Sequence, residues 1–262
     1  MSMITDDANA ARGDNAAPVR ETALEVRDLF KSYFGVPVLR GINFSVEKGE
    51  FFGFAGINGA GKSTFLKCML DFCHYESGEI FLFGTSVRKR IARRRIAFLP
   101  ERFIPPYYLT GEQFLRFMMR LQSAEYSRDE AEQMFADLDL DLQAMTKPVR
   151  SFSKGMTQKL GLAACFLVQR DMYFLDEPMS GLDPKARALV KRQFHKLAAR
   201  GATLFFTSHM LSDIEEICQR MGVLHDGHIR FLGTPSEMRE SFGGNTLEDA
   251  YLSAIGADNV SA

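Results

Sequence analysis

The sequence has almost no excess charge of either sign. Its 32 Lys and Arg residues are balanced by 33 Asp and Glu residues, which gives a net charge of −1 at pH 7. Proteins dedicated to nucleic-acid binding usually carry a clear basic excess, so we expect no nucleic acid as a partner. The basic run at residues 88–95 could be a phosphate or lipid patch, but the overall balance favours a solvated helix face.

A long apolar stretch is also missing. No apolar run approaches the roughly 20 residues that a membrane-spanning helix needs. The chain does not open with the charged-then-apolar pattern of a secretory signal. The longest candidate, residues 160–168, is typical of a core helix. If the protein works at a membrane, we expect another chain to supply the membrane-spanning part.

Cysteine is scarce and scattered. The four cysteines are Cys68, Cys73, Cys165 and Cys218, and none is paired in a C-x-x-C spacing. Cys73 and His74 could be two metal ligands, but two residues do not make a metal site. We therefore expect buried free thiols and a reducing cytoplasm.

The most informative stretch covers residues 51–64. An apolar run at 51–54 predicts a buried strand, and Gly56-x-x-x-x-Gly61-Lys62-Ser63 then matches the phosphate-binding loop at every fixed position. Glycines let the backbone bend so that successive N–H groups point at anionic oxygens. The alternative is a glycine-rich turn that binds nothing. The strand before the loop and the helix after it favour a nucleoside triphosphate site.

Two side chains of this loop carry the chemistry. The helix that begins near Gly61 adds the positive end of its dipole to the site. We expect Lys62 to reach the β- and γ-phosphates as a point charge and the Ser63 hydroxyl to bind Mg²⁺.

An acidic pair follows a second apolar strand. Residues 172–175 predict a strand that ends at Asp176 and Glu177. Carboxyl ends of parallel strands meet at the ligand edge of such a sheet. Asp176 could hold Mg²⁺ through a water, and Glu177 could orient or deprotonate the attacking water. Adjacent acids are commonly just solvated, but the phosphate loop in the same chain favours the functional interpretation.

His209 follows a third apolar strand, at residues 203–207. An imidazole there could donate a hydrogen bond to a γ-phosphate oxygen and position Glu177. Taken alone, a histidine in this position is more often structural.

Strands alternating with helices predict an α/β fold with a mainly parallel sheet covered on both faces. Alternating patterns at 24–29 and 42–46, joined by a turn at 31–35, predict antiparallel strands ahead of the loop. Further strands are expected at 79–84 and 96–99, and a hairpin at 223–229. We expect a disordered tail at 1–20, one domain at 21–262 and a helical subdomain inserted at about 102–165, because no strand pattern occurs between about 110 and 150.

With these motifs in this order, residues 22–255 resemble the ATP-binding cassette (ABC) ATPases. Ile57 stands where the family often has proline. Residues 152–156, Phe-Ser-Lys-Gly-Met, stand where the family signature reads Leu-Ser-Gly-Gly-Gln, and they keep its serine and second glycine. Residues 174–178 look like the second nucleotide motif, residues 180–183 look like the D-loop, and His209 looks like the switch histidine. The resemblance implies the P-loop ABC ATPase fold.

The resemblance also implies a set of site residues for ATP and Mg²⁺. The catalytic residues would be Lys62, Glu177 and His209, and the Mg²⁺ ligands Ser63 and Asp176. Nucleotide contacts would come from Tyr33, Gly56, Asn58, Gly59, Ala60, Gly61, Lys62, Ser63, Thr64, Glu101, Ser153, Gly155 and Asp176.

Two members of this set leave alternatives open. Tyr33 falls where the family places its adenine-stacking aromatic, whereas the sequence alone favours simple packing, the more common role of an aromatic residue in a turn. Glu101 stands where the family usually has glutamine. An ionised carboxylate can accept hydrogen bonds but cannot donate them, so the role of Glu101 toward Mg²⁺ stays open.

The resemblance implies partners as well. Two ATPase subunits, in a homodimer or heterodimer, would enclose ATP so that Ser153 and Gly155 of one close over the γ-phosphate bound by the other. A separate transmembrane permease subunit would place the protein at the cytoplasmic face of the cell membrane. Residues 103–108 are unusually apolar for a loop and could contact that subunit, or they could pack beneath the helical insertion.

We therefore interpret the chain as the ATPase subunit of an ABC exporter, because residues 246–252 resemble the closing segment of exporter ATPases. An importer ATPase is the nearest alternative. A soluble ABC protein, such as a ribosome-associated or DNA-repair ATPase, would have two fused cassettes or a long coiled coil, and neither pattern is present. A non-catalytic regulatory cassette would be expected to lack Lys62, Asp176 or Glu177.

Overall fold

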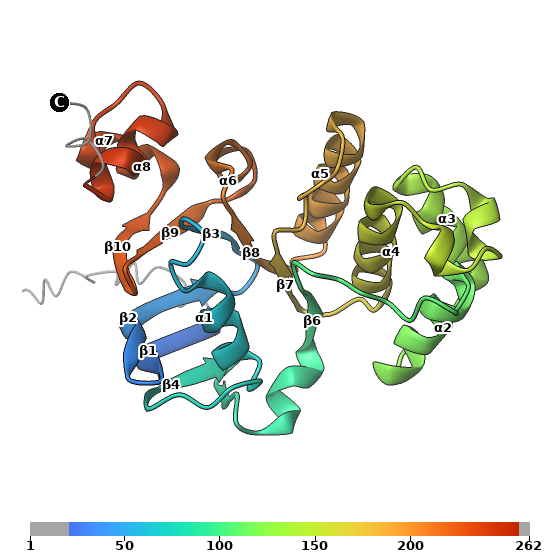
Figure 1. Ribbon diagram of the computed structural model, residues 1–262, viewed down its shortest axis with the longest axis horizontal. Coiled ribbons are helices and arrows are strands. Elements are labelled where there is room, and N and C mark those ends of the chain that lie inside the picture. The colour runs from blue at the N-terminus through green and yellow to red at the C-terminus, as the bar shows by residue number, and fades with distance from the viewer. Residues whose placement is uncertain (1–20, 257–262) are drawn as a thin grey trace, which may run out of the picture.

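The computed structural model describes residues 21–256, so the tail expected at residues 1–20 lies outside the described residues. A six-stranded sheet runs through the middle of the molecule in the order β10-β9-β3-β8-β7-β6 (Figure 1). Its neighbours are parallel except for the hairpin of β9 and β10. The predicted mainly parallel sheet is confirmed. The strands are β3 (Phe51–Ala55), β6 (Ile96–Leu99), β7 (Met172–Asp176), β8 (Thr203–Ser208), β9 (Arg220–His225) and β10 (His228–Gly233).

A second, antiparallel sheet has the order β2-β1-β4-β5, with β1 (Thr22–Tyr33), β2 (Val36–Glu47), β4 (Ser77–Leu82) and β5 (Thr85–Ser86). The turn predicted at 31–35 is shorter than expected, because β1 continues through Tyr33. Phe34 and Gly35 alone form it, with φ of 53° and 81°. Two left-handed residues suffice for a tight hairpin, and a phenylalanine gives no sequence signal for one.

The segment between β6 and β7 is helical and forms a lobe of its own beside the sheet (Figure 1). Side-chain hydroxyls of Thr110, Ser127 and Ser153 cap the first turns of its three α-helices. Its elements are α2 (Gly111–Leu121), α3 (Arg128–Asp137), the 3₁₀ turns η2 (Leu142–Met145) and η3 (Val149–Ser151), and α4 (Lys154–Leu167). That this segment is a subdomain with bounds near residues 102 and 165 stays a prediction.

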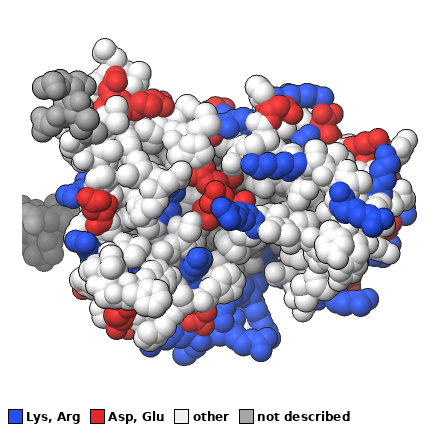
Figure 2. All heavy atoms as spheres, in the orientation of Figure 1, with Lys and Arg blue, Asp and Glu red and all other residues white. Residues whose placement is uncertain are grey.

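The remaining helices are α1 (Lys62–Met69), the 3₁₀ helix η1 (Arg90–Arg95), α5 (Pro184–Ala199), α6 (Leu211–Ile217), α7 (Pro235–Phe242) and α8 (Leu247–Ala254). The basic run includes η1, in which Ala92 is the buried residue. Figure 2 shows basic side chains gathered where Figure 1 draws this segment. Arg93 pairs with Asp71, and Arg95 pairs with Asp171 at 2.5 Å. These pairs fit a solvated basic helix better than a free phosphate patch.

Strand β3 is buried on both faces, which fixes the start of the phosphate loop. Phe52 and Phe54 point toward the antiparallel sheet, where their rings lie 5.4 and 5.8 Å from the ring of Phe44. Phe51 and Ala55 point to the opposite face and join the core beneath the helices. Among the described residues, none of the helices is long and apolar enough to cross a membrane.

Candidate functional site

Two glycines of the phosphate loop occupy positions where a side chain would clash or strain the backbone. A Cβ on Gly56 would lie 2.6 Å from the backbone oxygen of Leu224, on the neighbouring strand β9. Gly61 has φ of +112° and is the N-cap residue of α1. The loop therefore turns tightly against β9 and then aims the first turn of α1 at the space that it encloses.

That space is a hollow of about 290 Å³ at the carboxyl ends of β3 and β7. It lies where parallel strands of an open α/β sheet end, the usual ligand edge of such folds. Acidic side chains gather near the centre of the face shown in Figure 2. The lining residues are Val38, Ile57, Asn58, Gly59, Gly61, Lys62, Ser63, Thr64, Glu101, Asp176 and Glu177.

Lys62 is almost fully buried beneath the loop. Its Nζ donates to the backbone oxygen of Gly56 at 2.5 Å and to that of Ile57 at 3.2 Å. Burial lowers the pKa of this ammonium, and the carboxylates of Glu177 and Asp176 act in the opposite direction. The loop thus holds one positive charge at the edge of the hollow, in the position expected of a phosphate-binding lysine.

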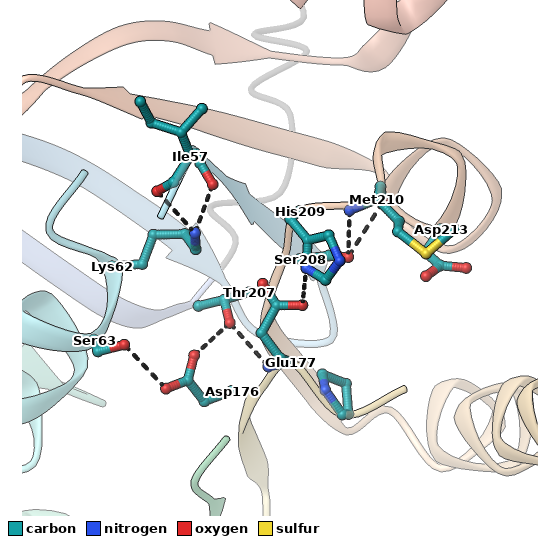
Figure 3. A network of polar contacts seen from close by, with 12 residues as sticks. Ile57, Lys62, Ser63, Asp176, Glu177, Thr207, Ser208, His209, Met210 and Asp213 are labelled. Atoms are coloured by element: carbon teal, nitrogen blue, oxygen red, sulfur yellow. Dashed lines mark hydrogen bonds and ion pairs between the residues drawn. The ribbon is translucent and has the colours of Figure 1, made fainter. Parts of the chain in front are cut away.

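Asp176 is the last residue of β7, and its two oxygens face different partners. Oδ1 accepts a hydrogen bond from the Thr207 hydroxyl at 2.6 Å, whereas Oδ2 accepts one from the Ser63 hydroxyl at 3.4 Å. Burial raises the pKa of Asp176, and the nearby Glu101 carboxylate raises it further, while Thr207 lowers it. The arrangement joins the first turn of α1 to the end of β7 (Figure 3).

Glu177 follows directly in a left-handed conformation, with φ of 49°. A non-glycine residue there costs on the order of 1–3 kcal/mol. Its Oε2 lies 2.8 Å from Nδ1 of His209, which follows β8 (Figure 3). Its Oε1 is buried and has no partner among the residues that the structure describes. Burial raises the pKa of this carboxyl, and His209 lowers it.

The free Oε1 atom is chemically informative. A buried carboxylate oxygen without a donor is costly, and proteins rarely retain one without use. A general base needs such an oxygen available to take a proton. One oxygen of Glu177 is oriented by His209 while the other stays open.

The oxygen atoms present fit Mg²⁺. This ion prefers hard oxygen ligands, keeps several waters and takes one or two protein ligands beside substrate phosphates. Ser63 and Asp176 supply such oxygens, and three carboxylates including Glu101 and Glu177 surround the single ammonium of Lys62. In the described part of the chain no cluster of three or more His, Cys, Asp or Glu side chains could hold a metal alone. An ion bound here would therefore take some of its ligands from phosphate oxygens.

The structure brings most of the predicted site residues to this hollow. Ala60 lies in the loop and is buried, and Glu101 is among the residues that line the hollow. Tyr33 ends β1 outside the residues that line the hollow. The ammonium of Lys31 lies 4.5 Å from its ring centre, and its phenol neighbours Thr64 at the start of α1. Its proposed contact with adenine stays a prediction.

Ser153 and Gly155 lie elsewhere. Ser153 caps α4 by accepting from the N–H of Met156 at 3.2 Å. Neither residue is among those that line the hollow. A Cβ on Gly155 would meet only the backbone oxygen of Gly181, at 3.9 Å, so the surface above it is open.

Sequence reasoning missed Thr207. Its hydroxyl donates to Asp176 and accepts from the backbone N–H of Glu177 at 3.0 Å, so one buried side chain holds both acids. The available signal was a hydroxyl residue near the end of β8, two positions before His209. The pairing of β8 with β7, which places Thr207 opposite Asp176, is a tertiary fact.

Comparison with known proteins agrees with this geometry. Residues 39–180, more than half of the chain, match the family described as ABC transporter. An uncharacterized ABC transporter ATP-binding protein of Nostoc sp. is 33% identical over 245 residues, which are 91% of this chain and 73% of that protein. The Nod factor export ATP-binding protein I of Burkholderia orbicola is 34% identical over 232 residues, which are 87% of this chain and 76% of that protein.

The fold is similar to that of a solved ATP-binding subunit of an ABC transporter. The TM-score is 0.81 at 31% sequence identity, and the match covers 89% of this chain and 99% of that structure. Family, relatives and fold thus agree with the loop, the acidic pair and the sheet that joins them. The chain belongs to the ABC transporter family, as an ATP-binding subunit with an ABC ATPase domain.

Proposed function

We propose that this chain hydrolyses ATP with Mg²⁺ in the hollow between the phosphate loop and β7. Hydrolysis would power export of a substrate through a separate transmembrane permease subunit. The catalytic part of this proposal rests on the geometry of Glu177. Its Oε2 lies 2.8 Å from Nδ1 of His209, and its buried Oε1 has no partner among the described residues. Glu177 would take a proton from the attacking water while His209 holds the carboxylate in place.

The other residues supply binding and charge. Lys62 would exchange its bonds to the loop carbonyls for the β- and γ-phosphates, and the loop's N–H groups would donate to phosphate oxygens. Asn58, Gly59 and Thr64 line the same hollow. Bound Mg²⁺, held by Ser63 and Asp176, would neutralise charge that develops on the phosphates.

The position of the signature residues supports a dimer in the ATP-bound state. Ser153 is exposed and Gly155 is open above its Cα, yet neither lines the hollow of its own chain. A second ATPase subunit, identical or related, could place its own signature segment over the γ-phosphate. The helix N-terminus that Ser153 caps would then face an anion.

The loop between β6 and α2 is the proposed contact with the permease. Ile104, Tyr107 and Tyr108 are 87%, 67% and 69% exposed, which is unusual for neighbouring large apolar side chains. Phe103 differs, because its ring packs 5.6 Å from that of Phe114. Each interpretation of this loop therefore applies to different residues. Phe103 packs against the helical insertion, whereas Ile104, Tyr107 and Tyr108 are available to contact a partner.

Export is favoured by the relative whose name states Nod factor export and by the resemblance of residues 246–252 to exporter ATPases. Import, or a soluble ABC ATPase without a transport role, would be the alternatives. Such a subunit would lie at the cytoplasmic face of the cell membrane, held there by the permease. In such a system the permease would select the substrate.

A pull-down from membranes tests the partner surface. Tagged wild-type chain should recover a polytopic membrane protein, and Ile104→Asp and Tyr107→Asp should lose it while keeping ATP affinity. Ile91→Asp, at an exposed apolar residue of η1, is the matched control and should recover it. Equal recovery by all variants would remove this loop from the interface.

Direction needs a separate test. A strain that lacks this chain should accumulate the cargo inside or become sensitive to it. A new requirement for an external nutrient would instead favour an importer.

A further inference from the structure

Two cysteines outside the catalytic residues lie in contact. Cys68 is buried in α1, and Cys73 is half-buried in the segment after it. Their sulfur atoms are 3.6 Å apart. The helix ends at Met69, and Asp71, with φ of 60°, turns the chain back so that the second thiol faces the first. Cys165 lies in α4, and Cys218 directly follows α6.

This pair connects to the nucleotide site from two directions. Cys68 is on the same helix as Lys62 and Ser63. The thiol of Cys73 lies beside the phenol of Tyr33, where burial raises the pKa of Tyr33 and the neighbouring thiol raises it further. Tyr33 also neighbours Thr64. A movement of Cys73 would therefore shift the aromatic ring of Tyr33, which is proposed to stack on adenine.

We propose that Cys68 and Cys73 form a reversible modification site, at which a peroxide closes an intramolecular disulfide and thereby weakens nucleotide binding through Tyr33. The coupling to nucleotide rests on the proposed role of Tyr33. The disulfide itself does not depend on that role.

The chemistry balances with peroxide as the oxidant. The Cys73 sulfur attacks one peroxide oxygen, an S–O bond forms, the O–O bond breaks and water leaves. The Cys68 sulfur then attacks the Cys73 sulfur, an S–S bond forms, the S–O bond breaks, and the thiol proton leaves with the hydroxide as a second water. Two thiols are oxidised and one peroxide is reduced to two waters.

The order of steps follows from exposure. Cys73 is the more accessible thiol, whereas burial raises the pKa of Cys68, so Cys73 reacts first and Cys68 second. A disulfide needs sulfurs about 2.05 Å apart, so they must approach by roughly 1.5 Å. The exposed turn around Phe72, which is 67% exposed, can make that shift. The buried helix carrying Cys68 cannot shift as easily, so Cys73 and its contact with Tyr33 should move.

Peptide mapping tests the modification directly. Trypsin cleaves after Lys67 and Arg88, so both cysteines fall in the single peptide 68–88, without Cys165 or Cys218. After treatment with hydrogen peroxide and alkylation under denaturing, non-reducing conditions, this peptide should be unalkylated. Its mass should be that of the reduced, unalkylated peptide less two hydrogens. Dithiothreitol should restore double alkylation. Cys73→Ser should abolish the product. A doubly alkylated peptide after peroxide would overturn the proposal.

Calorimetry of ATP binding tests the coupling. Oxidised wild type should bind ATP at least about fivefold more weakly than reduced wild type, the lower end of what base stacking on an aromatic ring supplies. Peroxide-treated Cys73→Ser should keep its untreated affinity. If the disulfide forms without loss of affinity while Tyr33→Ala weakens binding, the coupling is overturned. If Tyr33→Ala also binds normally, the role proposed for Tyr33 fails and the modification site stands.

Discussion

The hydroxyl of Thr207 donates a hydrogen bond to the carboxylate of Asp176 at 2.6 Å. The same oxygen accepts from the backbone N–H of Glu177 at 3.0 Å. The side chain of Thr207 is fully buried and links Asp176 to Glu177 within the chain of polar contacts that runs from Ser63 in α1 to His209 (Figure 3). One hydroxyl thus fixes both the proposed Mg²⁺ ligand and the backbone of the proposed base.

Thr207→Val should therefore lower kcat by about 10- to 100-fold, the usual effect of removing a group that orients a metal ligand. ATP affinity should change less, because Thr207 does not line the hollow. Thr203→Val is the matched control, since Thr203 lies on the same strand, is equally buried and accepts from Gly49 instead. If both variants turn over ATP at the same rate, Thr207 has no positioning role.

Lys62→Ala should weaken ATP binding at least about tenfold, because a hydrogen bond to a charged group contributes about 1.5–3 kcal/mol. Isothermal titration calorimetry with ATP and Mg²⁺ measures the change. The control is Lys67→Ala, on the exposed side of the same helix. Unchanged affinity in the Lys62 variant would show that the phosphates bind elsewhere.

Stability of the nucleotide-free protein should depend on pH through Glu177. Burial raises the pKa of this carboxyl above its ordinary 4.5, so folding favours the protonated form. The contribution of Glu177 to folding stability is fully present below pH 4.5 and is lost as the pH rises through the pKa of Glu177 in the folded state. Glu177→Gln cannot ionise, so it does not lose stability in this pH range. Its melting temperature should exceed that of wild type at neutral pH, and the difference should shrink toward pH 4.5. A constant difference across pH would contradict this assignment.

The sequence predicted the order of elements because each strand carried its own apolar pattern. The strand before the loop, the strand ending at Asp176 and the hairpin with Asp226 and Gly227 all appear in the structure. The φ values of Asp226 and Gly227, 48° and 75°, are those that a two-residue hairpin turn requires. The predicted strand at 79–84 lies at Ser77–Leu82 instead, because Phe83 and Gly84 adopt positive φ and turn the chain.

The sequence could not predict which side chains meet in the folded chain. Thr207 reaches Asp176 across 31 positions only because β7 and β8 pair in parallel register. Likewise, Phe103 packs on Phe114 while Ile104 remains exposed, although both belong to one apolar run. Apolar character alone does not tell a packed side chain from a contact surface. The contact between Cys68 and Cys73 depends on a left-handed residue at Asp71 that carries no sequence signal.

The most direct test of the catalytic proposal is steady-state ATP hydrolysis by Glu177→Gln. Glutamine keeps the shape of the side chain but cannot take the proton from water. Turnover should fall by at least about 100-fold, the scale of general-base catalysis, while ATP affinity is retained. With ATP and Mg²⁺ the variant should also persist as a dimer in size-exclusion chromatography. Glu79→Gln, at an exposed carboxylate of β4, should hydrolyse ATP like wild type, whereas near-normal turnover by Glu177→Gln would contradict the account.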